Sequence, residues 1–245
     1  SITFNKSIFI NEVNDFQAII LAAGRGKRLK SLTENIPKCL IKINDNTILD
    51  RQVEILFRNG INEIIIVTGY KYQLIKNHIN NKNIKIIVND KFTELDALYS
   101  TWLAKKYIKS DFLLLYGDLV FDEKIISSFL RQKSSSSLII DPIPKNDNHS
   151  VIIKNSIIKN ISLNSIKNDY SGQFIGICKF TGYDVNLFKE GFERFNEKYD
   201  LDGEFIRLIK FLIEQGFLIF EFPTKKSIWI NVNDQKSLDL AKQKF

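Results

Sequence analysis

The first half of the chain alternates short runs of β-branched and aliphatic residues with longer segments of helical periodicity. The apolar runs predict buried strands at residues 17–22, 63–67, 84–88 and 112–116. The helical spacing predicts helices at residues 47–58, 72–79 and 95–108, the first of them ended by Asn59-Gly60. Because strands and helices alternate, the pattern predicts an α/β fold: a Rossmann-like, mostly parallel mixed sheet flanked by helices.

After residue 118 the pattern changes to shorter and less regular units. Two turn-forming residues, Asn155-Ser156, predict an antiparallel hairpin over residues 150–161. Strands are expected at residues 138–140, 174–180 and 218–222, with a closing segment at 228–232. Helices are expected at residues 123–131, 183–195 and 204–214 and from Asp234 onward, and polar composition marks 132–137 and 142–148 as loops. The second half therefore adds a small antiparallel subregion to the sheet.

Length and composition bound the organisation of the chain. Its 245 residues are 44% hydrophobic, enough to bury one sizeable core, so residues 17–245 are predicted to form a single domain. Residues 1–16 are interpreted as an N-terminal extension, with a linker from an upstream fused domain preferred over an expression remnant or an added edge strand. The sequence contains no methionine, which we interpret as a processed start or a segment of a longer polypeptide.

Composition also limits the cellular compartment and the binding partners that we expect for this protein. No apolar stretch approaches the roughly 20 residues that cross a bilayer, and no basic region precedes an apolar signal core, so we expect a cytoplasmic protein with no membrane partner. The apolar contexts of Cys39 and Cys178 favour buried, reduced thiols. The net charge of +7 comes from dispersed lysines, so no nucleic-acid partner is expected, although anionic substrates would be attracted.

Residues 19–29 form an apolar run that passes into a loop with two glycines and three cations. Gly24 and Gly26 let backbone amides turn toward bound oxygens, and the cations supply the charge that holds a polyphosphate. The loop lacks the third glycine of the dinucleotide motif and the Gly-Lys-Ser/Thr ending of a Walker loop. The sequence therefore predicts a phosphate-binding loop of a different kind.

This loop reads L-A-A-G-x-G-x-R-L, and P-K-x-L follows it at residues 37–40. Together they resemble the signature of the nucleotidyltransferases that make nucleotide-activated sugars, alditols and choline. The resemblance continues through residues 50–52, 64–70, 89–92, 98–100 and 116–121, and so spans nearly the whole chain. The elements at residues 67–70 and 99–100 look most like the phosphocholine cytidylyltransferase-like branch. The resemblance implies a nucleotidyltransferase fold, with the acceptor bound by the antiparallel subregion.

The resemblance also implies the catalytic and metal-binding residues. Arg28 of the loop and Lys38 of P-K-x-L are implied to bind the triphosphate and neutralise its crowded oxygens. Asp118 follows a buried strand, where α/β sheets place their ligands, and is implied to be the first Mg²⁺ ligand. Asn233 stands where many relatives have the second metal-binding aspartate. Asp234 could substitute for it, although we prefer to interpret Asp234 as a helix N-cap.

Nucleotide recognition is expected from the loop and from two further side chains. The loop residues expected to contact the nucleotide are Leu21, Ala22, Ala23, Gly24, Gly26 and Arg28. Asn89 offers both a donor and an acceptor to a pyrimidine edge. Asp96 could accept a hydrogen bond from the exocyclic amine of cytosine or could cap the following helix, and the sequence leaves both interpretations open.

The acceptor side is less distinct. Lys179 is predicted to bind the acceptor phosphate, and Glu204 is predicted to contact an ammonium group or a hydroxyl. Gln173 is also predicted to bind the acceptor. It stands where relatives carry an acidic residue, and the loss of that charge argues mildly against a cationic acceptor.

These features predict an Mg²⁺-dependent nucleotidyltransferase that transfers CMP from CTP to a small phosphorylated acceptor and releases pyrophosphate. The acceptor is left open among phosphocholine, another phosphoamine, an alditol phosphate and a sugar phosphate, with a product destined for cell-surface polysaccharide or phospholipid synthesis. The alternatives are a sugar-1-phosphate uridylyl- or thymidylyltransferase and a non-enzymatic nucleotide-sensing module. A metal-dependent glycosyltransferase is disfavoured because Asp118 and Asp122 do not form a D-x-D motif.

Overall fold

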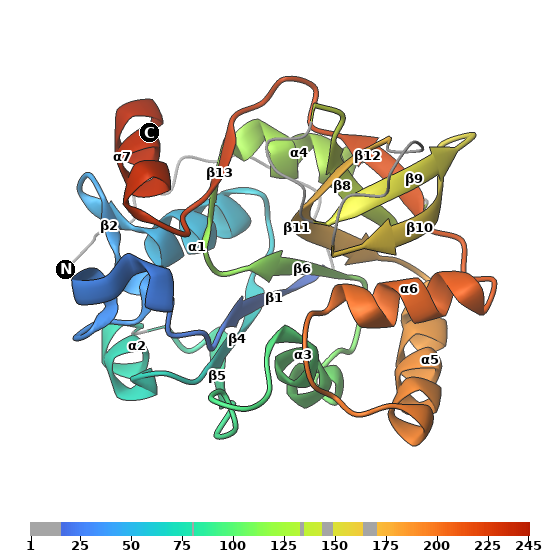
Figure 1. The fold of residues 1–245 in the computed structure, drawn as a ribbon, viewed down its shortest axis with the longest axis horizontal. Helices are drawn as coiled ribbons and strands as arrows, with labels where there is room; N and C mark the ends of the chain where they lie inside the picture. Colours follow the sequence, from blue (N-terminus) through green and yellow to red (C-terminus); the bar gives the residue numbers. More distant parts are fainter. Residues whose placement is uncertain (1–15, 80, 133–134, 144–148, 164–170) are drawn as a thin grey trace.

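The parallel half of the sheet lies at the centre of the computed structural model, which describes residues 16–79, 81–132, 135–143, 149–163 and 171–245 (Figure 1). Among these residues nine strands form one mixed sheet in the order β5-β4-β1-β6-β11-β8-β12-β10-β9. The parallel members are β1 (Gln17–Ala22), β4 (Glu63–Thr68), β5 (Ile84–Val88) and β6 (Phe112–Tyr116). Strands β1, β4 and β6 are almost entirely buried, which explains their continuous apolar sequences. The predicted α/β class is confirmed.

The second half of the chain extends this sheet with mostly antiparallel pairings. Strand β11 (Gly172–Phe180) runs antiparallel to β6, and beyond it come β8 (Ser137–Asp141), β12 (Phe220–Pro223), β10 (Ile157–Ser162) and β9 (Ser150–Lys154). The hairpin predicted at Asn155-Ser156 is confirmed, since both residues have positive φ and connect β9 to β10. Ser137, predicted to be in a loop, instead begins β8.

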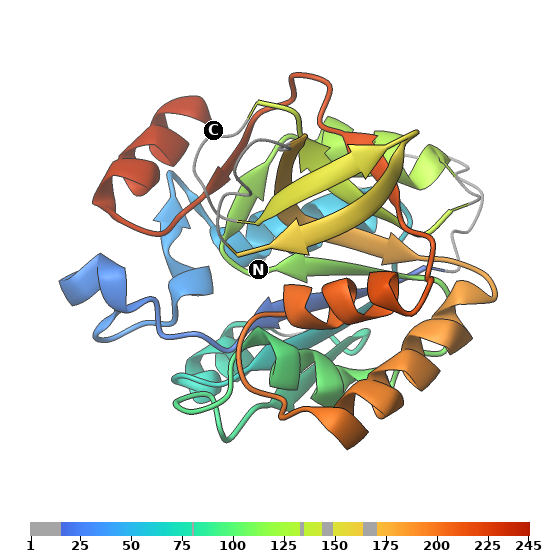
Figure 2. The same ribbon diagram turned by 45° about the vertical axis from the view of Figure 1, so that its right-hand side comes forward.

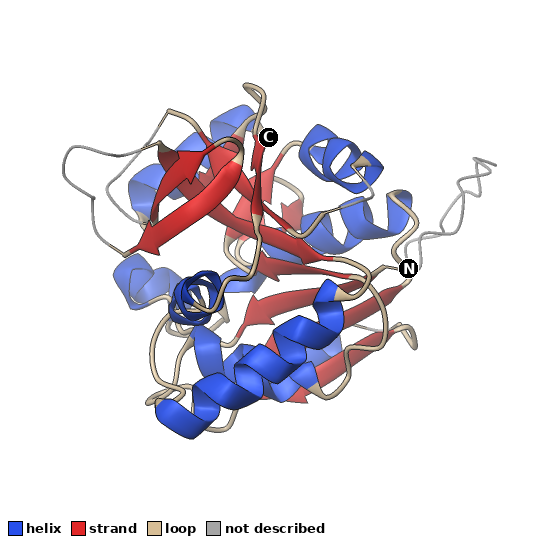
Figure 3. Ribbon diagram, turned by 90° about the vertical axis from the view of Figure 1, so that its right-hand side faces the viewer, coloured by secondary structure: helices blue, strands red, loops and turns tan. Residues whose placement is uncertain are grey.

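Helices cover both faces of the sheet (Figures 2 and 3). On one side are α3 (Ala97–Lys105), α5 (Asp184–Lys198) and α6 (Ile206–Glu214), and on the other are α1 (Ile48–Arg58) and α4 (Glu123–Arg131). Helix α2 (Tyr72–His78) follows β4, and α7 (Gln235–Lys244) ends the chain. A reciprocal capping box between Thr47 and Asp50 starts α1. None of the described helices is long and apolar enough to cross a membrane.

Several short elements lie beside the phosphate-loop segment, and of these the sequence predicted only the closing segment at residues 228–232. They are the 3₁₀ helices η1 (Lys27–Thr33) and η2 (Lys38–Leu40), the hairpin β2 (Lys42–Ile43) and β3 (Asn46–Thr47), and the antiparallel pair β7 (Leu119–Phe121) and β13 (Trp229–Asn231). Each is too short for a periodic pattern. A small apolar cluster packs them against α7, through residues that include Leu29, Ile43, Val120, Val232 and Leu238.

The predicted burial of the two thiols is confirmed, whereas most of the predicted N-terminal extension is not described. Cys39 and Cys178 are free and buried, and burial raises the pKa of the Cys39 thiol to about 12, so neither thiol is poised to ionise. Phe16 is buried in the main core, whereas the rest of the extension predicted over residues 1–16 lies outside the described residues. The single-domain assignment of residues 17–245 stays a prediction.

Candidate active site

A cavity of about 380 Å³ opens at the carboxyl ends of β1 and β6. Open α/β sheets bind ligands at this edge. The structure gathers most of the predicted site residues on its wall: Leu21, Ala22, Gly24, Gly26, Arg28, Lys38, Asp96, Asp118, Gln173, Glu204 and Asn233. Residues far apart in the sequence therefore share one site.

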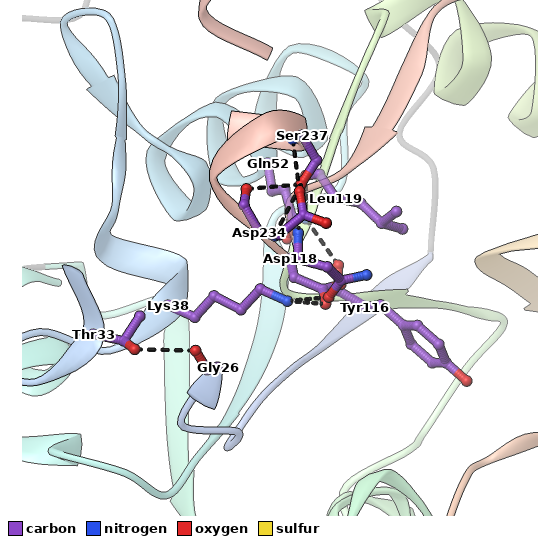
Figure 4. A network of polar contacts seen from close by, with 10 residues as sticks. Gly26, Thr33, Lys38, Gln52, Tyr116, Asp118, Leu119, Asp234 and Ser237 are labelled. Carbon is purple, nitrogen blue, oxygen red and sulfur yellow. Dashed lines mark hydrogen bonds and ion pairs between the residues drawn. The ribbon is translucent and has the colours of Figure 1, made fainter. Parts of the chain in front are cut away.

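The loop after β1 forms one side of the cavity. Gly26 has a φ of 71°, in the left-handed region, and its carbonyl accepts hydrogen bonds from the Leu29 amide at 3.0 Å and the Thr33 hydroxyl at 3.0 Å (Figure 4). A Cβ at Gly26 would lie only 3.0 Å from Cδ of Lys38. The aliphatic part of Lys38 therefore packs directly against the loop, while Arg28 remains exposed at the cavity.

Asp118 is held in a tight turn between β6 and β7. The Gly117 amide donates to the Leu21 carbonyl at 2.8 Å, and a Cβ on Gly117 would lie 2.7 Å from that oxygen, so only glycine fits there. The buried Gln52 amide donates to the carbonyls of Tyr116 at 2.9 Å and Leu119 at 2.8 Å, on either side of the turn (Figure 4). Gln52 is a positioning residue that the sequence analysis missed. Its signal was a lone amide on the apolar face of a predicted helix.

The pairing of β7 with β13 brings Asn233 to Asp118. Trp229, Ile230 and Asn231 pair in register with residues 121, 120 and 119, and the Val232 amide then donates to the Asp118 carbonyl at 2.9 Å. The Asp234 carboxylate caps α7 by accepting from the Ser237 amide at 2.8 Å. This confirms the preferred interpretation of Asp234 as an N-cap.

One cation and two oxygen ligands meet at the centre of the site. Nζ of Lys38 lies 2.6 Å from Oδ2 of Asp118 and 2.6 Å from Oδ1 of Asn233. The second oxygen of Asp118, Oδ1, is buried and has no hydrogen-bond partner among the described residues. A carboxylate with a free oxygen beside an amide oxygen is a donor set that suits Mg²⁺. No group of three or more His, Cys, Asp or Glu side chains is arranged for a metal in the described part of the chain, so these two residues would share the ion with substrate oxygens and water.

The other end of the cavity is acidic. Helix α3 begins beside the segment before α6, and the Leu98 amide donates to the Gly203 carbonyl at 3.1 Å, which brings Asp96 and Glu204 to the same wall. Burial, followed by the charges of Asp96 and Asp118, raises the pKa of Glu204 to about 7. Asp96 is exposed at the cavity, yet the surrounding walls also raise the pKa of its carboxyl. Its side chain makes no capping hydrogen bond to α3.

Two aromatic side chains beside the acidic end were not predicted. Tyr116 and His149 line the cavity with their rings 5.9 Å apart in an edge-to-face arrangement. Burial lowers the pKa of His149, which keeps the imidazole neutral. The Tyr116 hydroxyl is buried without a hydrogen-bond partner within the described residues. Either residue could have been identified only by knowing which residues lie next to it in the folded protein.

Three predicted site residues do not face the cavity, and these assignments are corrected. Lys179 is fully buried, its ammonium donates to the carbonyls of Phe129, at 2.7 Å, and Gln132, and it does not line the cavity. Asn89 is also fully buried, and its amide donates to the Leu95 carbonyl and the Ser100 hydroxyl.

Asn89 therefore braces the turn that leads to Asp96 and does not line the cavity. Ala23 points its carbonyl at the Tyr70 amide, 3.0 Å away, and does not line the cavity.

Fold and site together define an α/β protein whose first strand leads into a glycine-containing, cationic loop on the wall of the cavity. The family comparison makes the assignment definite, because residues 18–174 match the MobA-like NTP transferase domain family, and the chain belongs to that family.

Known proteins agree with this assignment. The chain is similar to CTP:phosphoglutamine cytidylyltransferase of Campylobacter jejuni, at 30% identity over 67% of this chain and 72% of that protein. It is also similar to choline-phosphate cytidylyltransferase of Streptococcus pneumoniae, at 36% identity over 43% of this chain and 46% of that protein. The solved CTP:phosphocholine cytidylyltransferase from Streptococcus pneumoniae superimposes with a TM-score of 0.80 at 19% identity, covering 93% of this chain and 98% of that one. This last match supports the fold.

Proposed function

We propose that this protein transfers CMP from CTP to a small phosphorylated acceptor, releases pyrophosphate and uses Mg²⁺. The observation that carries the proposal is the meeting of Lys38, Asp118 and Asn233 beside the loop that holds Arg28. This cluster supplies cationic side chains and hard oxygen ligands at one point of a cavity. Phosphoryl and nucleotidyl transfer need that combination more than they need a proton-transfer residue.

The chemistry follows from the charges of the reactants. The acceptor phosphate has a second pKa of about 6, so it is mostly a dianion at neutral pH and attacks the α-phosphorus without a general base. Lys38 and Arg28 hold the triphosphate oxygens and stabilise the charge that moves onto departing pyrophosphate. Mg²⁺ bound to Asp118 and Asn233 would supply further charge neutralisation. The neutral His149 is not required as a base.

Among the acceptors considered, we propose a phosphoamine. Asp96 and Glu204 put two carboxylates on one wall of the cavity, where burial raises the pKa of both, and a cationic nitrogen would favour their charged forms. Gln173 on the same cavity wall is neutral, but these two residues supply the negative charge in its place. The amine-containing substrates named for the relatives from Campylobacter jejuni and Streptococcus pneumoniae support this choice.

The runner-up is a sugar-1-phosphate uridylyltransferase. The observation in its favour is the neutral Asn233 beside Asp118, because the acetylglucosamine-1-phosphate uridylyltransferases resemble this chain in having Val-Asn there. Sugar hydroxyls could also donate to Asp96 and Glu204.

A pyrophosphate-release matrix tests the proposal. The purified protein with Mg²⁺ is given CTP, UTP, ATP or GTP against phosphocholine, phosphoethanolamine, an alditol phosphate and a hexose 1-phosphate. We expect the highest kcat/KM with CTP and a phosphoamine. Preference for UTP and a hexose phosphate would support the runner-up, and no turnover in any combination would favour a nucleotide-sensing module.

A further inference from the structure

The ammonium of Lys38 lies between the two oxygens assigned to the divalent cation. Nζ is 2.6 Å from both Oδ2 of Asp118 and Oδ1 of Asn233, and the Lys38 side chain is 12% exposed. A metal ion bound to these two oxygens would lie within a few ångströms of the ammonium, and the two cations would repel each other. The position seen for Lys38 therefore opposes metal binding by Oδ2 of Asp118 together with Asn233.

We propose that Lys38 is a built-in substitute for the divalent cation, which occupies the metal position in the nucleotide-free protein and leaves it when a triphosphate binds. The second half of this statement rests on the proposed function, whereas the first does not. A lysine suits the task because its charge is compact and its four-carbon stem is flexible. The protein then binds its metal together with the nucleotide and only weakly beforehand.

Two further observations support a movable Lys38. The first is the contact between its stem and Gly26, at 3.0 Å from the position of a Cβ, which joins Lys38 mechanically to the phosphate loop. A ligand that reorders the loop must also displace the stem. The second is the orphan Oδ1 of Asp118, which keeps one carboxylate oxygen available while Oδ2 holds the ammonium. A metal could enter on that oxygen as the lysine withdraws.

Direct metal binding tests the proposal without nucleotide, acceptor or turnover. The probe is Mn²⁺ alone, with free ion measured by electron paramagnetic resonance in a titration of the purified protein. We compare the wild type with Lys38→Met, which keeps the length of the stem and removes the charge. Lys27→Met is the matched control, because Lys27 belongs to the same loop segment, is exposed and does not line the cavity.

The expected result is that Lys38→Met binds Mn²⁺ about tenfold more tightly than the wild type, while Lys27→Met does not. Adding Asn233→Ala to Lys38→Met should remove the gain, which locates the new affinity at this site. Equal Mn²⁺ affinity of Lys38→Met and wild type overturns the proposal, and so does an equal gain in Lys27→Met, which would be a bulk charge effect. Lys38→Gln serves as the second neutral variant if Lys38→Met does not fold.

The two proposals fail separately. An inactive pyrophosphate-release matrix would count against the proposed function and leave the Mn²⁺ measurement unaffected. Unchanged Mn²⁺ affinity in Lys38→Met would leave a working CTP-dependent transferase in which Lys38 binds only phosphate.

Discussion

Replacing Glu204 by glutamine should stabilise the folded protein at alkaline pH and much less at acidic pH. The carboxyl has an ordinary pKa of 4.5, and burial together with Asp96 and Asp118 raises it to about 7 in the folded chain. Between these two values the folded state holds more protons than the unfolded state, so the wild type loses stability as pH rises through this window. A glutamine cannot ionise and avoids that loss.

The magnitude follows from the size of the pKa rise. At about 1.4 kcal/mol per pKa unit, the complete rise would correspond to about 3 kcal/mol. Because Glu204 is only partly buried and faces cavity water, we expect about 1–2 kcal/mol. The assay is urea unfolding at about pH 5 and about pH 8.5, with Glu214→Gln as the control, since Glu214 lies exposed at the end of α6.

Glu204→Gln should gain stability mainly at the higher pH, whereas Glu214→Gln should change equally little at both. An equal gain of Glu204→Gln at both pH values would refute the reasoning, because it would mean that ionisation of Glu204 carries no cost in the folded state. The same variant bears on the acceptor. The KM for a phosphoamine should fall as pH rises through about 7 in the wild type and not in Glu204→Gln. Titration of the acceptor phosphate is common to both proteins and cancels in the comparison.

Four further predictions concern the cavity and its supports. Asp118→Ala and Lys38→Ala should each lower kcat by about 10²-fold or more with an unchanged circular dichroism spectrum, and near-normal turnover would remove that residue from the mechanism. Asp96→Asn should raise the KM of a phosphoamine and leave the CTP-to-UTP ratio of kcat/KM unchanged; a lost CTP preference would instead assign Asp96 to the cytosine amine. Lys179→Met should cost about 1–3 kcal/mol in urea unfolding, because the carbonyls of Phe129 and Gln132 lose their donor, without changing acceptor KM. Gln52→Leu should lower kcat more than it changes either KM, since it frees the turn that carries Asp118; unchanged kcat would contradict this positioning role.

The central strands were predictable because burial on both faces leaves a continuous apolar sequence with a clear end. Residues 112–116 illustrate this, since the apolar run stops at Gly117-Asp118 and the structure ends β6 at Tyr116. The position of Asp118 at the carboxyl end of a parallel strand then followed from topology. The same logic placed Arg28 and Lys38 near it, because both follow β1 closely in sequence.

The misplaced residues failed for a different reason. Lys179 stands in β11, which is buried along its whole length, and the carbonyls that satisfy its ammonium belong to residues about fifty positions earlier. No local pattern distinguishes such a lysine from one that faces a ligand. Asn89 is similar, because its role in the turn before Asp96 depends on Ser100 being brought back to it by α3. Side-chain hydrogen bonds of this kind are set by packing, and the sequence shows only the residue type.

The short ladder between β7 and β13 determines which part of the site is completed last during synthesis of the chain. The ladder brings Asn233, which lies just before α7, close to Asp118. The hydrogen bond between Lys38 and Asn233 spans 195 positions of the chain. A growing chain emerges from the ribosome N-terminus first, so the parallel strands and the phosphate loop are available long before Asn233 is made. A truncated chain that lacks residues after 228 would retain the loop and Asp118 without the second cation ligand. The proposed metal site therefore gains its second oxygen ligand only once the chain has been made as far as Asn233.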